Sequence, residues 1–275
     1  MVIGNPMIFL KYPLEEALRS LVKFGFDGVE LWPPQIEVCK TDELRKQLAE
    51  HISSLGLSLV GLNCADPPYF EALDSPDDVE GVVQGLKQDI DIAASMGMSQ
   101  LLSWDGRRRE SMTDSDLHGW VLDETVNIFR EAVSYAETKG ITITVEIHPF
   151  TVGIDVDFAC KLYDRVDSPS FGITYDSCHF AVGLPNGYID AIPKLGHRIN
   201  NVHFADSDKH SSELHFAPGT GCLDLDAIVN ELKAIRYQGP MMLDLWLYPF
   251  PEEGSKIGMP YIHDVMKTLG YPSEA

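Results

Sequence analysis

The sequence lacks any run of about 18 consecutive apolar residues, the length that a membrane-spanning helix needs. Its first residues, Met1 to Pro6, have neither the basic start nor the long apolar stretch of a secretory signal peptide. These two absences exclude an obvious membrane anchor or export signal. We therefore expect a cytoplasmic protein without a membrane partner.

Cysteines are few and scattered. The chain has 5 of them in 275 residues, and no two form a Cys-x-x-Cys pair. An odd number at wide spacing fits neither a disulfide framework nor a structural zinc site. We predict reduced thiols at all of these positions, which are Cys39, Cys64, Cys160, Cys178 and Cys222.

Basic residues are also scarce. The 21 Lys and Arg stand against 42 Asp and Glu, which gives a formal net charge of −21 and a pI near 4.6. Such a surface repels polyanions on average. We expect no nucleic acid partner, and anionic membranes are disfavoured for the same reason.

Two further absences concern the fold: the chain has no Pro-, Gly- or Ser-rich linker and no G-x-G-x-x-G turn after its first apolar run. The second absence disfavours a doubly wound open sheet, the main alternative. What is present is an alternation of eight strand-like runs with helical segments, which predicts a (β/α)8 TIM barrel as a single domain over residues 1–275. The runs are Val2–Leu10, Gly28–Trp32, Leu57–Asn63, Gln100–Trp104, Ile141–His148, Phe171–Tyr175, Ile199–Phe204 and Met241–Trp246.

Three segments carry clear helix signals: Trp120–Lys139, Thr41–Leu55 and Asp224–Arg236. The first is followed by Gly140, a typical C-terminal stop, and Thr41 is suited to cap the second. In the second helix we expect the leucines and isoleucine at helical spacing to face the core, namely Leu44, Leu48, Ile52 and Leu55.

Ionisable side chains follow four consecutive strand-like runs: Glu146, Asp176, His203 and Asp244. Alone, each is most simply a polar residue at the rim of the barrel. Three carboxylates buried beside one imidazole, however, need a cation to offset their charge. We predict one divalent metal ion there, with Mn favoured by the oxygen-rich ligands and Mg, Co, Fe or Zn as alternatives.

These strand ends form an ordered series of motifs: Val145-Glu146-Ile147-His148-Pro149, Tyr175-Asp176-Ser177-Cys178-His179, Val202-His203-Phe204-Ala205-Asp206 and Pro218-Gly219-Thr220-Gly221. The series resembles the sugar phosphate isomerase/epimerase family of xylose isomerase-like TIM barrels. The resemblance implies that the four positions named above bind the metal. It also implies that His179 contacts the substrate and that Glu146 and Asp244 act as acid/base groups.

One position departs from the family pattern. Its last ligand is usually glutamate, whereas this chain has Asp244, whose arm is shorter by about 1.5 Å, one carbon–carbon bond. Either the backbone lies closer to the metal, a water bridges the gap, or Asp244 does not ligate. Three protein ligands would still make a working site.

The resemblance and the ligand set together predict a metal-dependent isomerase or epimerase of a ketose or related polyol. Glu146 would exchange a proton next to a metal-bound carbonyl through an enediolate. The alternative is a lyase that eliminates water or another group from a keto sugar or cyclic polyol, with His148 as base. The second reading rests on a Glu-x-His resemblance to inosose and dehydroshikimate dehydratases. A third reading of His148 is a hydrogen bond to a loop.

Further candidates for substrate contact lie near the same ends. Trp32, Trp104 and Trp246 are placed to stack on a sugar-like ligand, although core packing explains them equally well. Arg107, in the run 107–109, can receive an anionic group, but a salt bridge or a subunit contact is the simpler explanation. We also assign His215 to substrate binding, and we expect a homo-oligomer.

Two other classes remain open. Multi-zinc apurinic endonucleases share the barrel, and Glu213-Leu214-His215 imitates part of a second metal site. Those enzymes need histidines at the third and fourth strand ends, where this chain has Asn63-Cys64 and Trp104-Asp105. An inactive binding subunit is the other class, which Asp244 leaves open.

Overall fold

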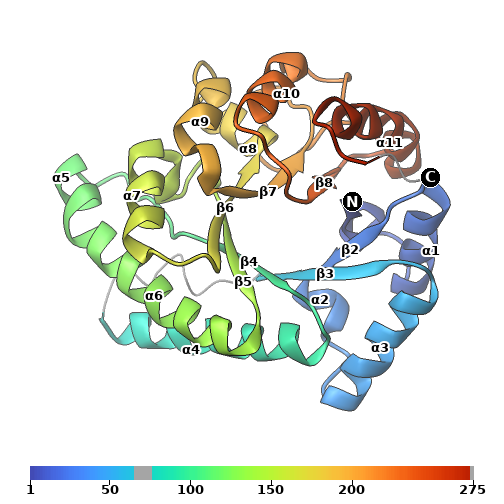
Figure 1. The fold of residues 1–275 in the computed structure, drawn as a ribbon, viewed down its shortest axis with the longest axis horizontal. Helices are drawn as coiled ribbons and strands as arrows, with labels where there is room; N and C mark the ends of the chain where they lie inside the picture. Colours follow the sequence, from blue (N-terminus) through green and yellow to red (C-terminus); the bar gives the residue numbers. More distant parts are fainter. Residues whose placement is uncertain (65–75, 273–275) are drawn as a thin grey trace.

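The computed structural model describes residues 1–64 and 76–272. Eight parallel strands form a closed barrel in the order β1 to β8, which confirms the predicted TIM barrel (Figure 1). The strands are β1 (Val2–Gly4), β2 (Gly28–Leu31), β3 (Ser58–Asn63), β4 (Gln100–Trp104), β5 (Thr142–Glu146), β6 (Phe171–Asp176), β7 (Ile199–Phe204) and β8 (Met241–Leu243).

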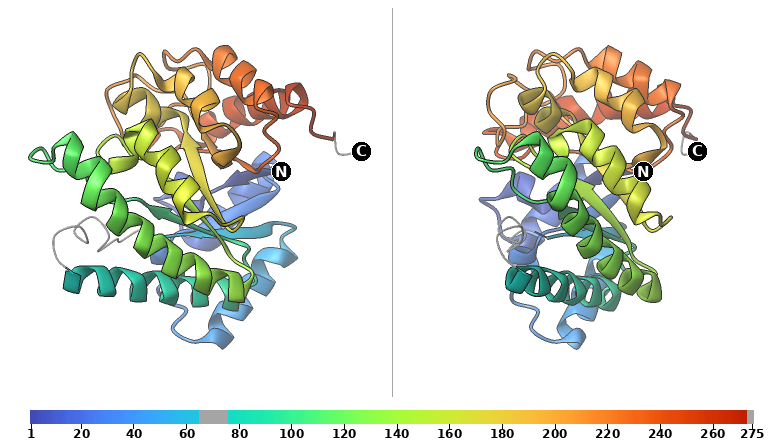
Figure 2. Two further views of the ribbon diagram at one scale, coloured as in Figure 1. Left: turned by 60° about the vertical axis from the view of Figure 1, so that its left-hand side comes forward. Right: turned by 90° about the vertical axis from the view of Figure 1, so that its left-hand side faces the viewer.

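Helices surround the strands on the outside of the molecule in all three ribbon views (Figures 1 and 2). The longer ones are α1 (Leu14–Phe24), α3 (Asp42–Ser54), α4 (Pro76–Ser95), α6 (Leu122–Lys139), α7 (Val156–Val166), α9 (Tyr188–Leu195), α10 (Leu225–Ala234) and α11 (Pro251–Thr268). The short ones are α2 (Pro33–Ile36), α5 (Asp114–Asp116), α8 (Ser177–Gly183) and the non-α turns η1 (Pro6–Phe9), η3 (Leu117–Val121), η4 (Val152–Ile154) and η5 (Gly196–Arg198).

The first strand is shorter than predicted. The expected strand Val2–Leu10 ends at Gly4, and η1 follows immediately. Asn5 caps this turn by accepting a hydrogen bond from the Met7 amide at 2.9 Å, and Pro6 has no amide hydrogen for a strand ladder. The runs predicted to end at His148 and Trp246 also stop early, at Glu146 and Leu243.

Helix ends agree better with the sequence signals. The Thr41 hydroxyl accepts a hydrogen bond from the Leu44 amide at 3.3 Å, and Gly140 ends α6 in the left-handed region at φ 71°. Two details were wrong. Leu44 is 42% exposed, whereas Leu48 and Leu55 are half-buried and Ile52 is buried. Trp120 lies in the π-helical turn η3 rather than in α6.

Strand register brings the polar strand ends to one level of the barrel. Trp104 pairs with Glu146, Asp176 pairs with His203, and His203 pairs with Met242. Because all strands are parallel, these positions meet at the carboxyl end of the barrel, where the loops that follow the strands begin.

Cys39, Cys160, Cys178 and Cys222 are free thiols, as predicted. Across residues 1–64 and 76–272, no helix combines the length and the apolar character that crossing a membrane requires.

Candidate metal centre and substrate cavity

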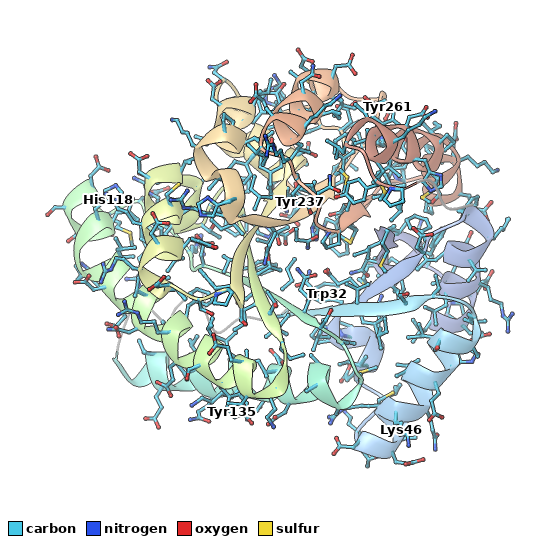
Figure 3. All side chains as sticks on the ribbon, in the orientation of Figure 1. Trp32, Lys46, His118, Tyr135, Tyr237 and Tyr261 are labelled. Carbon is cyan, nitrogen blue, oxygen red and sulfur yellow. The ribbon has the colours of Figure 1, made fainter. Side chains whose placement is uncertain are left out.

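A cavity of about 260 Å³ opens at the carboxyl end of the barrel. It brings together most of the candidate residues from strands far apart in the sequence. Figure 3 shows Trp32 toward the middle of the molecule, while Lys46 and Tyr135 lie at its periphery. The lining consists of Asn5, Met7, Ile8, Trp32, Asn63, Trp104, Glu146, His148, His179, His203, Glu213, His215, Met242, Asp244 and Trp246.

Glu146, at the end of β5, has partners on both carboxylate oxygens. Its Oε1 lies 2.6 Å from Nδ1 of His203. Its Oε2 accepts a hydrogen bond from the Trp104 indole at 3.2 Å and lies 3.1 Å from Nε2 of His148. The carboxylate is 4% exposed, so these contacts fix its orientation inside the protein.

Glu146, Asp176 and His203 form a compact group whose candidate ligand atoms all lie within 4.8 Å of one another. Asp176 uses Oδ1 to cap α8 by accepting from the His179 amide at 2.7 Å, which leaves Oδ2 facing Nδ1 of His203 at 3.9 Å. Neither of these two buried atoms has a hydrogen bond with ordinary geometry among the described residues. Nδ1 of His203 lies beside Oε1 of Glu146, so the buried atom without a close partner is Oδ2 of Asp176, and a bound cation would satisfy it.

Asp244 reaches this group despite its shorter arm. Its Oδ2 lies 3.9 Å from Nδ1 of His203 and 2.9 Å from Nδ1 of His215, while its Oδ1 accepts from the Trp246 amide at 2.9 Å. The backbone after β8 therefore holds the carboxylate at the edge of the candidate metal centre. Whether it ligates directly stays a prediction.

Burial and neighbouring carboxylates shift the pKa values of the ionisable groups around the candidate metal centre. Burial raises the pKa of Asp176 to about 6 and that of Glu30, in β2, to about 7. Burial also disfavours a charged imidazole at His203, but the carboxylates of Glu146, Glu30 and Asp244 together outweigh burial and raise the pKa of His203 to about 10. No Lys or Arg is present among the described residues of the lining to balance the charge. The donor set thus fits a divalent cation.

Three further imidazoles line the cavity next to the carboxylates. The ring centroids of His148 and His179 are 3.9 Å apart, and those of His179 and His215 are 4.9 Å apart. Burial holds the pKa of His179 well below its ordinary value, so this imidazole is neutral at physiological pH. A neutral ring can donate one hydrogen bond and accept another, which suits a hydroxyl-rich ligand.

His215 is brought to the site by the loop between β7 and α10. Its amide donates to the Trp246 carbonyl at 3.0 Å, and the neighbouring Phe216 pairs with Asp206 in an antiparallel bridge. Asp206 in turn accepts from the backbone amides of Ser207, Gly219, Gly221 and Leu223 at 2.8–3.0 Å. The Pro-Gly-Thr-Gly segment is therefore wrapped around one buried carboxylate.

The predicted aromatic residues divide into two groups. Trp32 and Trp246 meet edge to face with centroids 5.4 Å apart, and Trp104 packs against His148 at 4.6 Å. All three tryptophans line the cavity, whereas the exposed Arg107 does not, and its backbone bridges to Thr151. The substrate role assigned to Arg107 stays a prediction.

Sequence reasoning missed several lining residues. Asn5, Met7 and Ile8 come from the η1 turn, which was predicted as strand, and Met242 is an apolar residue inside β8. Glu213 was noted only as part of an imitated metal motif. The proline and asparagine at the start of η1 were the available signal for a turn.

Comparison with known proteins identifies the family. A family model described as Xylose isomerase-like TIM barrel matches residues 18–271. The chain belongs to this family. This membership confirms the resemblance that the strand-end motifs indicated.

Curated proteins that resemble the chain include two sugar epimerases. Fructoselysine 3-epimerase of Shigella flexneri is 24% identical over 252 residues, which cover 86% of each chain. L-ribulose 3-epimerase of Methylomonas sp. is 25% identical over 250 residues, covering 83% of this chain and 77% of the relative. The predicted enzyme class, sugar isomerases and epimerases, is thus the class of these relatives.

A solved structure shows the same fold over nearly the whole chain. The IOLI protein with a bound zinc atom has a TM-score of 0.82 at 20% identity and covers 98% of this chain and all of its own. At this identity the likeness supports the barrel, and the metal is a property of that protein.

Proposed function

We propose that this member of the xylose isomerase-like family is a divalent-metal-dependent epimerase or isomerase of a ketose. The observation that carries the proposal is the convergence of Glu146, Asp176 and His203 within 4.8 Å, with Asp244 at the edge of the group. The two curated relatives act as 3-epimerases on sugars. They favour epimerisation at C3, next to the ketose carbonyl.

A divalent ion held by these ligands supplies a Lewis acid that stabilises negative charge developing on substrate oxygens. The rest of the chemistry is proton transfer by side chains. Burial alone would raise the pKa of Glu146, but His203 and His148 beside it hold the pKa well below its usual range. Glu146 is therefore a carboxylate able to accept a proton from carbon.

Inversion at carbon requires a second acid/base group on the other face of the substrate. Asp244 comes from β8, three strands away from Glu146 in β5, and both line the same cavity. Burial opposes ionisation of Asp244, but His215 outweighs it and lowers the pKa of the carboxyl. We assign Asp244 to the second proton transfer and His179 to a hydrogen bond with a substrate hydroxyl. His215, whose Nδ1 lies 2.9 Å from Oδ2 of Asp244, positions that carboxylate.

The test is proton exchange with solvent. The purified protein, stripped of metal with a chelator and reloaded with Mn²⁺, is incubated in deuterated water with a panel of ketoses, and products are followed by NMR. We expect deuterium at C3 of both epimers, dependence on added metal, and loss of exchange by about 10³-fold or more in Glu146→Gln, in line with the loss of an essential base. Full activity in Glu146→Gln, or in the stripped protein, contradicts the proposal.

A lyase is the second candidate, and His148 is the observation that favours it. Its imidazole is 5% exposed, lines the cavity and leaves Nδ1 without a hydrogen bond among the described residues. A base at this position could remove a proton during elimination from a cyclic keto polyol. Inososes assayed for a new conjugated ultraviolet absorption test this function, and His148→Ala must abolish the signal if His148 is the base.

A further inference from the structure

The substrate cavity carries only acidic charge apart from its histidines. Glu146, Asp244 and Glu213 line it, and Asp176 lies against His203 beneath them. A divalent ion offsets two of these negative charges and leaves the cavity negative. A phosphate or carboxylate on the substrate would therefore enter a field of its own sign.

The part of the cavity lining that the structure describes includes no Lys or Arg to reverse this field. Arg107 is exposed and outside the lining, Arg108 pairs with Asp114 at 3.4 Å, and Lys209 lies over the Tyr188 ring at 4.7 Å. The segment 65–75, which follows β3 and lies outside the described residues, has no Lys or Arg in its sequence. Apart from its histidines, the described lining offers an anionic substituent no partner of opposite charge, and His203 and His215 already face Glu146 and Asp244.

Glu213 lines the cavity but does not belong to the candidate metal centre. It belongs to the loop after β7 and is exposed, and its Oε2 accepts a hydrogen bond from the Trp246 indole at 3.1 Å. Trp246 meets Trp32 edge to face. A carboxylate next to two indole rings is the combination that attracts an ammonium group, by charge and by cation–π contact.

We propose that Glu213, Trp246 and Trp32 form a subsite for a cationic substituent, so that the preferred substrate is a ketose carrying an amino group rather than a phosphate. This inference rests on the proposed function and names its substrate class. The subsite is separate from the ligands of the metal, because none of its three residues belongs to the compact group of Glu146, Asp176 and His203. Loss of this subsite should reduce the preference for an amino ketose and leave metal binding intact.

The experiment compares four substrates: whichever neutral ketose shows C3 exchange, its 1-amino-1-deoxy and 6-amino-6-deoxy forms, and its 6-phosphate. For the metal-loaded protein we expect kcat/KM for one amino ketose to exceed that of the neutral ketose by about tenfold, from an exposed ion pair and a cation–π contact of a few-fold each. The phosphate should be the poorest substrate. The preference should shrink as salt is raised.

Glu213→Gln keeps an acceptor for the Trp246 indole and removes the charge. In this variant the amino preference should fall to about twofold or less, while the Mn²⁺ content stays that of the wild type. Glu50→Gln is the matched control, because it removes the same single negative charge. Glu50 lies on α3, with a carboxylate oxygen 3.9 Å from Nζ of Lys46, and Figure 3 shows Lys46 at the periphery of the molecule. Glu213→Lys should raise kcat/KM for the 6-phosphate.

The outcomes separate the two proposals. If no ketose exchanges deuterium, the proposed function fails. If the neutral ketose exchanges but neither amino form is preferred, or if the phosphate is the best substrate of the wild type, the cationic subsite alone is overturned. An amino preference that persists in Glu213→Gln also overturns it.

Discussion

Trp104 and His148 hold the carboxylate of Glu146 from one side, and His203 approaches it from the other. These partners do more than satisfy a buried oxygen. They set the direction in which Glu146 presents its free lone pairs to a cation or to a substrate carbon. The contribution of one such contact can be isolated, because the Trp104 indole donates only through Nε1.

We expect Trp104→Phe to weaken Mn²⁺ binding by about ten- to hundredfold, since outer contacts to a metal ligand typically have this effect. Phenylalanine retains an aromatic ring against His148 and removes only the indole donor. The measurement is isothermal titration of the stripped protein with Mn²⁺. Trp120→Phe serves as control, because Trp120 is 49% exposed and its indole bonds to Asp116 on the outside of the barrel. Equal affinities of Trp104→Phe and wild type would contradict the assignment.

Asp105 follows Trp104 and is 4% exposed, and its Oδ2 accepts a hydrogen bond from the Gly153 amide. Burial raises the pKa of this carboxyl from 3.8 to about 6, although the contacts to Thr151 and Gly153 oppose the shift. The folded state therefore binds a proton that the unfolded state has already released between pH 4 and 6. Stability should fall as the pH rises through this window.

Asp105→Asn should accordingly be more stable than wild type at pH 8, by up to about 3 kcal/mol, and close to wild type at pH 4.5. The amide oxygen keeps the bond to Gly153 without a buried charge. Chemical denaturation at the two pH values measures the difference. If the stability difference between Asp105→Asn and wild type were the same at both pH values, ionisation of Asp105 would not destabilise the folded protein.

Which site residues the sequence could predict depends on where their side chains lie. Glu146, Asp176, His203 and Asp244 end apolar strands, and parallel strands force their ends to one edge, so the pattern was sufficient. Glu213 lies in a loop whose path depends on long-range contacts, such as the bond to Trp246. No local periodicity encodes such a contact.

At the scale of elements, the long helices and most strands follow from the alternation of apolar patterns and from stop signals such as Gly140. The errors are at strand ends. The apolar residues of η1 read as a continuation of β1, because a short apolar run does not distinguish a buried strand from a buried turn. Asn5 and Pro6 mark the boundary between β1 and η1, since β1 ends at Gly4 and η1 begins at Pro6.

The loop between β7 and α10 contains no regular element and yet carries His215 and Glu213. Asp206 holds it by accepting from several backbone amides, and it is 2% exposed. We expect Asp206→Ala to lower the free energy of unfolding by about 1–3 kcal/mol, because the buried Ser207 amide loses its acceptor, while the amides of the exposed Gly219 and Gly221 can bond to water instead.

The Asp206→Ala loop should also become accessible to protease and to amide hydrogen exchange, which mass spectrometry can localise to residues 207–224. Asp226→Ala is the control, since Asp226 is exposed in the first turn of α10 and holds no loop. Protection of residues 207–224 equal to wild type would contradict the role of Asp206.

At the scale of the whole molecule, the formal charge of −21 is not evenly placed. The carboxylates of the metal centre come from β5, β6 and β8, and His203 comes from β7, so half of the closed barrel directs polar side chains to one point. Repulsion among these groups opposes closure of that half. A cation bound there ties four consecutive strands together and removes the repulsion.

Metal loading should therefore stabilise the barrel as a whole. An ion at 100 times its Kd stabilises the folded state by about 2.7 kcal/mol, which corresponds to a rise in Tm of roughly 5–10 °C for a chain of this size. Scanning calorimetry of chelator-treated protein with and without Mn²⁺ measures it. In His203→Gln the metal-dependent rise should disappear, while in His197→Gln, a histidine of η5 outside the lining residues, it should persist. A wild-type Tm that does not respond to Mn²⁺, Mg²⁺, Co²⁺ or Zn²⁺ would mean that protons on His203 and His215, rather than a metal ion, balance the negative charge of the carboxylates. In that case the metal dependence in the proposed function would be wrong.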